Sequence, residues 1–191
     1  MSDKYVNFAA LSGSESDEAY RIVVRQRNSA IALIAPHAGK IEFGTSEICL
    51  SVAGEDLTYY LFEGCKPDNN TDLHITSSRF DEPKGLDIAQ SAQMVVTFHG
   101  QKGSDHFVNV GGLEEQLCVS LICHLRAGGF VADWNKNPNL QGREKNNICN
   151  RGIKEKGLQL EISRGLREAL TTDKKAMECF SRAVRSALDK A

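Results

Sequence analysis

Two short runs that are almost continuously apolar, "AIALIAPH" (30–37) and "MVVTFHG" (94–100), most constrain what this chain can fold into. A β-strand shows this pattern when both of its faces are covered, as in a sheet with helices on each side. Stretches with helical patterns, "TSEICLSVAG" (45–54) and "GLDIAQSAQ" (85–93), lie between these runs. This interleaving predicts an α/β fold in which a mixed β-sheet is flanked by helices.

The rest of the chain continues this alternation. "YRIVVRQR" (20–27) predicts a strand that a short turn at Asn28-Ser29 joins to the run at 30–37. Further strands are predicted at 57–64, 73–80, 106–112 and 156–163, amphipathic helices at 114–129 and 173–191, and a polar loop at 134–152.

The composition narrows the class of protein. With 191 residues, 41% of them hydrophobic, and no internal repeat or linker, the chain is expected to form one domain, residues 1–191, with a sizeable core. A formal net charge of -2 without a clustered basic stripe argues against a nucleic-acid partner.

The start of the sequence is polar and resembles no signal peptide, and no stretch is long and apolar enough for a transmembrane helix. We therefore expect cytoplasmic synthesis and no membrane partner.

The six cysteines have no CxxC spacing. In a protein made in a reducing cytoplasm, such cysteines are expected to be free thiols. The oligomeric state does not follow from these features.

Two histidines and a glutamate form a candidate metal site. His37 and His99 each fall at the end of an apolar strand run, and functional groups of α/β sheets gather at the carboxyl ends of strands. Glu42 follows His37 by five positions, a separation that neither a helix nor a strand brings together. A loop that turns back, which glycines permit, would let them meet. Two histidines and a carboxylate are typical ligands of a catalytic zinc ion; the alternative is two hydrogen-bonded histidines at strand ends and a solvated glutamate.

The chain also carries a series of longer motifs, in the order "IAPHAGKIEFGTSEI", "YYLFEG", "LHITSSRFDEP", "VVTFHG", "VNVGG", "NICNRG" and "LQLEISRGLR". Together they resemble the phage and bacillar poly-γ-glutamate hydrolases, a family also labelled phage-related replication proteins. The resemblance extends from about Tyr5 to Arg167 and implies a zinc-dependent amide hydrolase with a core similar to that of zinc carboxypeptidase A. One departure is Ala38, where the family often has glycine; alanine fits a tight loop unless the position needs a positive φ.

The resemblance also implies roles for individual residues. The metal ligands would be His37, Glu42 and His99, holding one zinc ion per chain. Glu161 would be the general base that takes a proton from the attacking water. The pair Asn150-Arg151 would grip a substrate carboxylate, and Arg151 or a neighbour would also steady the oxyanion.

The pattern of the last predicted strand agrees with a special role for Glu161. Alternation along 156–163 places Glu161 on one face together with Gln159. A glutamate in a buried sheet is costly unless it is paired or used, so an ion pair with Arg164 or Arg151 is the alternative. Of Arg164 and Arg167, which follow this strand, we expect one to face the cleft.

Other charged residues leave two interpretations open. Arg79 can clamp a substrate carboxylate in a two-pronged manner, or it can pair with Asp81 or Glu82. Arg143 lies in the predicted polar loop and is either a substrate contact or part of a solvated surface. His74 is expected to make a structural hydrogen bond beside the sheet.

The candidate metal site and the resemblance together predict a zinc-dependent amidohydrolase. The resemblance implies its substrate, a γ-glutamyl amide bond, most simply within poly-γ-glutamate. One alternative is a zinc peptidase or deacylase that acts on small N-acyl amino acids. Another is a phage replication accessory protein, against which the acidic charge balance argues. A protein without an export signal would reach an extracellular polymer after phage or host lysis.

Overall fold

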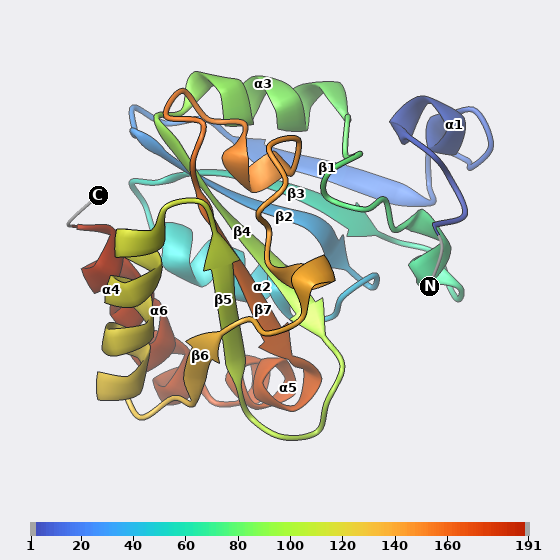
Figure 1. Cartoon of the computed structure of the whole chain (residues 1–191). Coiled ribbons are helices and arrows are strands. Elements are labelled where there is room, and N and C mark those ends of the chain that lie inside the picture. Colours follow the sequence, from blue (N-terminus) through green and yellow to red (C-terminus); the bar gives the residue numbers. More distant parts are fainter. Residues whose placement is uncertain (1–2, 190–191) are drawn as a thin grey trace.

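A seven-stranded mixed sheet runs through the part of the chain that the computed structural model describes, residues 3–189. Its strands are β1 (Tyr20–Arg25), β2 (Ile31–Gly39), β3 (Thr58–Gly64), β4 (Met94–Gln101), β5 (Val108–Gly112), β6 (Ala132–Trp134) and β7 (Leu158–Ser163). They lie in the order β1-β3-β2-β4-β7-β5-β6 (Figure 1). The central strands β3, β2, β4 and β7 are parallel, whereas β1 and β5 run antiparallel to β3 and β7. The predicted α/β fold with a mixed sheet is confirmed.

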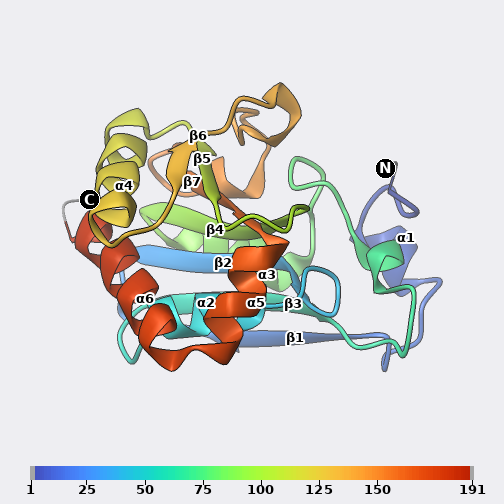
Figure 2. The same cartoon turned by 90° about the horizontal axis from the view of Figure 1, so that it is seen from below.

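Helices cover both faces of this sheet (Figures 1 and 2). They are α1 (Phe8–Ser12), α2 (Thr45–Ala53), α3 (Pro83–Ser91), α4 (Glu115–Ala127), α5 (Arg164–Thr172) and α6 (Lys174–Leu188), with single 3₁₀ turns η1 (Asn70–Leu73), η2 (Pro138–Leu140) and η3 (Ile148–Asn150). α2, α4, α5 and α6 enclose the larger core on one face, and α1 and α3 pack on the other. None of the helices among the described residues could span a membrane.

The two-sided burial explains the apolar runs of the sequence. In β4, Val96 and Phe98 point into the core beneath α2, α4, α5 and α6, while Val95 points into the core on the side of α3. All three side chains are fully buried. A strand with both faces buried has no position at which a charged side chain would meet water.

The connections create a switch point beside β2. α2 leads from β2 to β3 on one side of β2, and the chain later returns through α3 to place β4 on the other side. In open α/β sheets, a crevice forms outside the carboxyl ends of the strands at such a point. The carboxyl ends of β2 and β4 are therefore the place where a sheet of this kind gathers its functional groups.

The predicted strand at 73–80 is wrong. After η1, this segment forms a turn and extended loop outside the sheet, because β3 already pairs with β1 on one side and β2 on the other. Its backbone groups bond to side chains instead of a ladder: Ile75 O contacts His37, and Thr76 N–H donates to Asp3.

The first two strands are connected as expected but do not pair. A short segment at Asn28-Ser29 joins β1 to β2, while β3 lies between them in the sheet. The turn residues predict only that the two strands follow each other in the chain, and they do not predict that β3 lies between them in the sheet.

Candidate metal centre and active site

A bulge near the carboxyl end of β2 presents His37. Pairing of β2 with β4 ends at Ile34, and its register with β3 shifts between Ala35 and Ala38. Pro36 falls within this shift, and proline has no N–H group to donate to a sheet ladder. Beyond Ile34, β2 and β4 are no longer paired, so side chains can lie between their carboxyl ends.

The chain then turns back so that Glu42 reaches His37, as predicted. Gly39 and Gly44 have φ angles of 65° and 92°, in the left-handed region where glycine has no steric penalty. Ala38 lies outside that region, so the position does not require glycine. The Glu42 N–H donates to the His37 carbonyl oxygen at 2.9 Å, which closes the turn.

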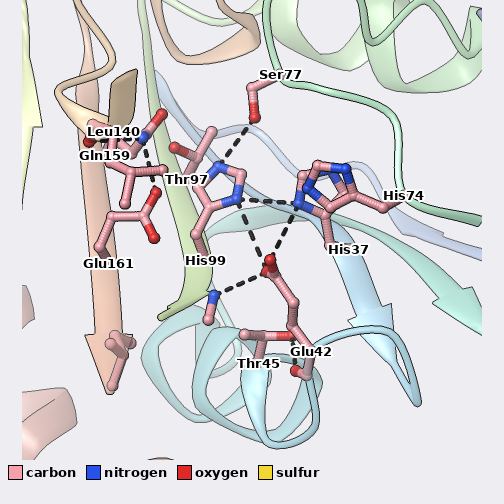
Figure 3. A network of polar contacts seen from close by, with 12 residues as sticks. His37, Glu42, Thr45, His74, Ser77, Thr97, His99, Leu140, Gln159 and Glu161 are labelled. Atoms are coloured by element: carbon pink, nitrogen blue, oxygen red, sulfur yellow. Dashed lines mark hydrogen bonds and ion pairs between the residues drawn. The ribbon is translucent and has the colours of Figure 1, made fainter. Parts of the chain in front are cut away.

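The three predicted ligands come together at this place (Figure 3). The Nδ1 atoms of His37 and His99 lie 3.1 Å apart. The Glu42 carboxylate lies 3.5 Å from the first and 3.8 Å from the second, and the Gly100 N–H donates to it at 2.7 Å. Both histidines are buried, whereas 15% of the Glu42 side chain is exposed, so the group meets solvent on the side of the carboxylate.

The outer nitrogens of both imidazoles have partners in the segment that follows η1. His37 Nε2 donates to the Ile75 carbonyl oxygen at 2.7 Å, and His99 Nε2 lies 3.3 Å from Ser77 Oγ. A carbonyl can only accept, so the His37 proton belongs on Nε2 and its Nδ1 lone pair faces the other ligands. Metal-binding histidines characteristically have such a partner on the second nitrogen.

The donor set fits a metal ion. Two nitrogens bound to one tetrahedral zinc at about 2.0–2.1 Å are about 3.3 Å apart, close to the 3.1 Å between the Nδ1 atoms here. Two imidazoles and a carboxylate leave a fourth tetrahedral position open, as in catalytic zinc sites. His37, Glu42 and His99 therefore form a possible metal site, and their role as the metal ligands stays a prediction.

The ionisation of the three side chains also suits a cation. Burial opposes the charge on Glu42, but the neighbouring His37 outweighs it and lowers the pKa of Glu42 to about 2. Burial lowers the pKa of His99 to about 3, which keeps this imidazole neutral. Burial acts in the same direction on His37, yet Glu42 raises the pKa of His37 above its ordinary value. The carboxylate therefore stabilises positive charge between the imidazoles, and a metal ion that binds there would replace the proton that Glu42 otherwise favours on His37.

Glu161 lies on the neighbouring strand, on the same side of the sheet as the imidazole of His99 (Figure 3). His99 and Glu161 are register partners in the parallel pair β4 and β7, and side chains of register partners project from the same face. Gln159 Nε2 donates to the Glu161 carboxyl at 2.9 Å. Gln159 is itself held by Leu140 O and by Asn147 Nδ2, so the long loop before β7 orients the Glu161 side chain.

The surroundings of Glu161 favour its protonated form. Burial, followed by the negative charge of Glu42, raises the pKa of Glu161 well above its ordinary value. A carboxyl with a raised pKa can accept a proton and return it near neutral pH. This property and its place beside His99 suit Glu161 for the predicted acid/base role.

Of the two arginines after β7, Arg167 is turned toward the ligands. Its buried guanidinium packs against Gly100 and donates to the carbonyl oxygens of Ile162 and Phe43. The Arg164 side chain is 72% exposed. The expectation that one of this pair faces solvent agrees with Arg164, while Arg167 lies beneath the turn that carries Glu42. That one of the pair faces the cleft stays a prediction.

Arg79 has a different partner from those considered in the sequence. Its Nη2 donates to the Asp3 carboxylate at 2.6 Å, because Asp81 instead accepts from the Phe8 N–H and Glu82 caps α3. About half of the Arg79 side chain is exposed, and only one of its nitrogens is engaged by Asp3. The guanidinium therefore retains donors that face solvent.

The loop before β7 holds Arg143 and Asn150 in different settings. Arg143 is half exposed and pairs with Glu115 at 2.8 Å. Asn150 is buried, and its side-chain amide donates to the carbonyl oxygens of Gly142 and Glu144. These contacts show that Asn150 stabilises the conformation of the loop. Its contact with substrate stays a prediction.

Arg151 lies apart from the metal ligands. The Ile153 N–H donates to Ala92 O, just before the start of β4, whereas His99 lies near the other end of this strand. At about 3.3 Å per residue, that separation along the strand is on the order of 20 Å. The predicted role of Arg151 beside the reacting carbonyl has no support in this placement and stays a prediction.

The sequence reasoning missed three residues that orient the site: Gln159, Ile75 and Ser77. The alternation of β7 placed Gln159 on the face of Glu161, a signal that could have identified it. No local signal marked Ile75 or Ser77, because a strand was expected there and their contacts with histidines arise only in the folded chain.

An α/β sheet that brings two histidines and a carboxylate together beside a buried glutamate is an arrangement typical of metal-dependent hydrolases. The model of the poly-gamma-glutamate hydrolase family matches residues 5–186. The chain belongs to this family and is a hydrolase that acts on amide bonds.

Comparisons with individual proteins agree with this family membership. The UPF0714 protein YmaC of Bacillus subtilis (strain 168) is 39% identical over 173 residues, which are 90% of this chain and 73% of YmaC. A solved structure of a bacteriophage poly-gamma-glutamate hydrolase superposes with a TM-score of 0.94 at 32% identity, covering 99% of this chain and 98% of the other. The zinc-free structure of YndL superposes with a TM-score of 0.93 at 32% identity, covering 98% of each chain.

Proposed function

We propose that this chain cleaves γ-glutamyl amide bonds within poly-γ-glutamate and uses one zinc ion held by His37, Glu42 and His99. The convergence of these three donor groups beside Glu161 is the observation that carries the proposal. A solved relative described as zinc-free supports zinc as the metal. Zinc bound there would polarise the scissile carbonyl and lower the pKa of the attacking water.

Glu161 accepts the proton of the attacking water and later delivers it to the leaving amine. The raised pKa of Glu161, caused by burial and by Glu42, supports both steps because it makes the carboxylate a stronger base toward the water proton, which the resulting acid can then deliver. Gln159 keeps the Glu161 carboxyl in one orientation through its hydrogen bond of 2.9 Å. Arg167 fixes the turn that carries Glu42 by binding the Phe43 carbonyl oxygen.

Substrate recognition needs local positive charge, because poly-γ-glutamate carries one free carboxylate on each residue and the chain has a net charge of -2. At least one of Arg79, Arg143 and Arg151 binds these carboxylates. Arg79 has the strongest support, since it is half exposed and belongs to the segment whose Ile75 and Ser77 contact the histidine ligands.

Metal analysis and product size together test the proposal. The purified protein should contain about one zinc per chain, and chelation should abolish cleavage of poly-γ-glutamate until zinc is returned. A rapid fall in polymer length with few new small products would indicate attack within the chain. Cleavage of small N-acyl amino acids but not of the polymer, or full activity without metal, would overturn the proposal.

A further inference from the structure

One short segment surrounds the two histidine ligands. Residues 74–79 supply the Ile75 carbonyl oxygen to His37 and the Ser77 hydroxyl to His99. The ring of His74 also stacks on that of His37, with ring centres 3.9 Å apart (Figure 3). The orientation of both imidazoles therefore depends on where this segment lies.

The segment 74–79 is not part of the sheet, so other contacts must hold it. One is the Ile148 N–H, which donates to Ser77 O at 3.0 Å. The other is the carboxylate of Asp3, which comes from the start of the described chain. Figure 1 shows this start lying beside η1, directly before the segment.

Asp3 binds the segment at three points. Its Oδ1 lies 2.8 Å from His74 Nδ1, and its Oδ2 accepts from the Thr76 N–H at 2.7 Å and from Arg79 Nη2 at 2.6 Å. Only 3% of the Asp3 side chain is exposed. These contacts bracket Ile75, the residue whose carbonyl oxygen binds His37.

We propose that Asp3 is a positioning residue of the metal centre: by holding segment 74–79, it fixes the groups that orient His37 and His99 for metal binding. This inference rests on the proposed zinc site. It assigns the first residues of the described chain a part in metal affinity, although Asp3 itself touches no proposed ligand.

The chain offers a matched control for the test. The Asp81 carboxylate accepts from the Phe8 N–H at 2.6 Å, so it also ties the N-terminal part to the body of the protein. It makes no recorded contact with residues 74–79 among the described residues. Asp81→Asn therefore weakens a comparable tie by removing its charge, in the same way as Asp3→Asn, without disturbing the partners of the histidines.

The experiment compares the full chain with its Asp3→Asn, Asp3→Ala and Asp81→Asn variants. Zinc affinity is measured by competition with a chromophoric chelator, and the visible spectrum of the Co²⁺-substituted proteins reports the geometry of the ligands. Thermal unfolding of the metal-free proteins measures general stability.

Loss of a group that orients metal ligands typically costs ten- to a hundredfold in affinity. Asp3 contacts segment 74–79, which in turn orients the histidines, so its effect is indirect. We therefore expect zinc affinity to fall about tenfold for Asp3→Asn and further for Asp3→Ala, with an altered Co²⁺ spectrum. Asp81→Asn should lower only the unfolding temperature. Excess zinc should restore the turnover of Asp3→Asn.

Two results have distinct meanings. If the unchanged chain binds no zinc tightly, the proposed metal site itself is wrong. If it binds zinc and both Asp3 variants match its affinity and Co²⁺ spectrum, the assignment of Asp3 is overturned. A variant that fails to fold is replaced by the other, since either Asp3 change alone decides the comparison with Asp81→Asn.

Discussion

Two glutamates lie close together at the site, and their surroundings shift their pKa values in opposite directions: Glu42 is partly exposed, and Glu161 is buried. The region of Glu42 is a short turn in which His37 and the Gly100 N–H offset burial, so the pKa of Glu42 falls to about 2. Glu161 instead lies on the buried strand β7. Among the described side chains, only the Gln159 amide donates to its carboxyl group, and burial raises the pKa of Glu161 well above its ordinary value.

This difference divides the chemistry between the two carboxyl groups. A carboxylate that stays ionised is suited to bind a cation, whereas a carboxyl whose proton is easily exchanged is suited to acid/base catalysis. The charge of Glu42 is itself one cause of the raised pKa of Glu161. The two functions are therefore coupled, and four changes test how far they can be separated.

The largest effect is expected in the metal-binding region. His99→Ala removes one of three ligands and should abolish tight zinc binding and, with it, turnover. Zinc content after dialysis is the measurement. His106→Ala, in an exposed loop, is the control and should keep its zinc. Full zinc occupancy in His99→Ala would contradict the assignment of the ligands.

The next effect separates the two glutamates directly. Glu161→Gln keeps the shape but removes the base, so turnover should fall on the order of a hundredfold or more while zinc stays bound. Glu42→Gln should instead weaken zinc binding. Steady-state kinetics and zinc titration of both variants measure this contrast. Near-normal turnover in Glu161→Gln with zinc bound would make Glu161 merely structural.

A smaller effect is expected from the side chain that orients the base. Gln159→Met removes the donor to Glu161, and turnover should fall about tenfold with unchanged zinc affinity, as for other groups that orient a reacting residue. Gln141→Met is the matched control. Gln141 lies in the loop before β7, and its side-chain amide donates to Asn135 O rather than to Glu161. Equal turnover in the two variants would show that Glu161 needs no such support.

The smallest effect is expected from the half-exposed Arg79. Arg79→Lys keeps the charge but loses the planar fork that binds carboxylates in two-pronged fashion. KM for poly-γ-glutamate should rise by about threefold with little change in kcat, since a single half-exposed contact contributes less than about 1.4 kcal/mol. Arg143→Lys and Arg151→Lys serve as comparisons. Unchanged kinetics in all three would exclude these arginines as the carboxylate clamp.

Much of the site could be predicted because its signals are local. Apolar runs reveal two-sided strands, and the histidines at their ends identify where β2 and β4 present functional groups. The turn from His37 to Glu42 involves six consecutive residues, of which Gly39 adopts the positive φ that permits it. Alternation along β7 likewise places Glu161 and Gln159 on one face.

Other features needed the folded chain. The sequence alone determined most of the strands, the helices α2, α3, α4 and α6 and the metal-ligand candidates, because these follow from periodicity and from residues close in the chain. It did not reveal α1, α5 or β6, and it predicted a strand at 73–80 that does not form. Only the tertiary structure decided that 74–79 leaves the sheet, that Asp3 binds this segment, and that Arg151 lies far from His99. Such contacts join residues about 70 positions apart, and their partners are chosen by packing and hydrogen bonding across the whole domain, which no local pattern records.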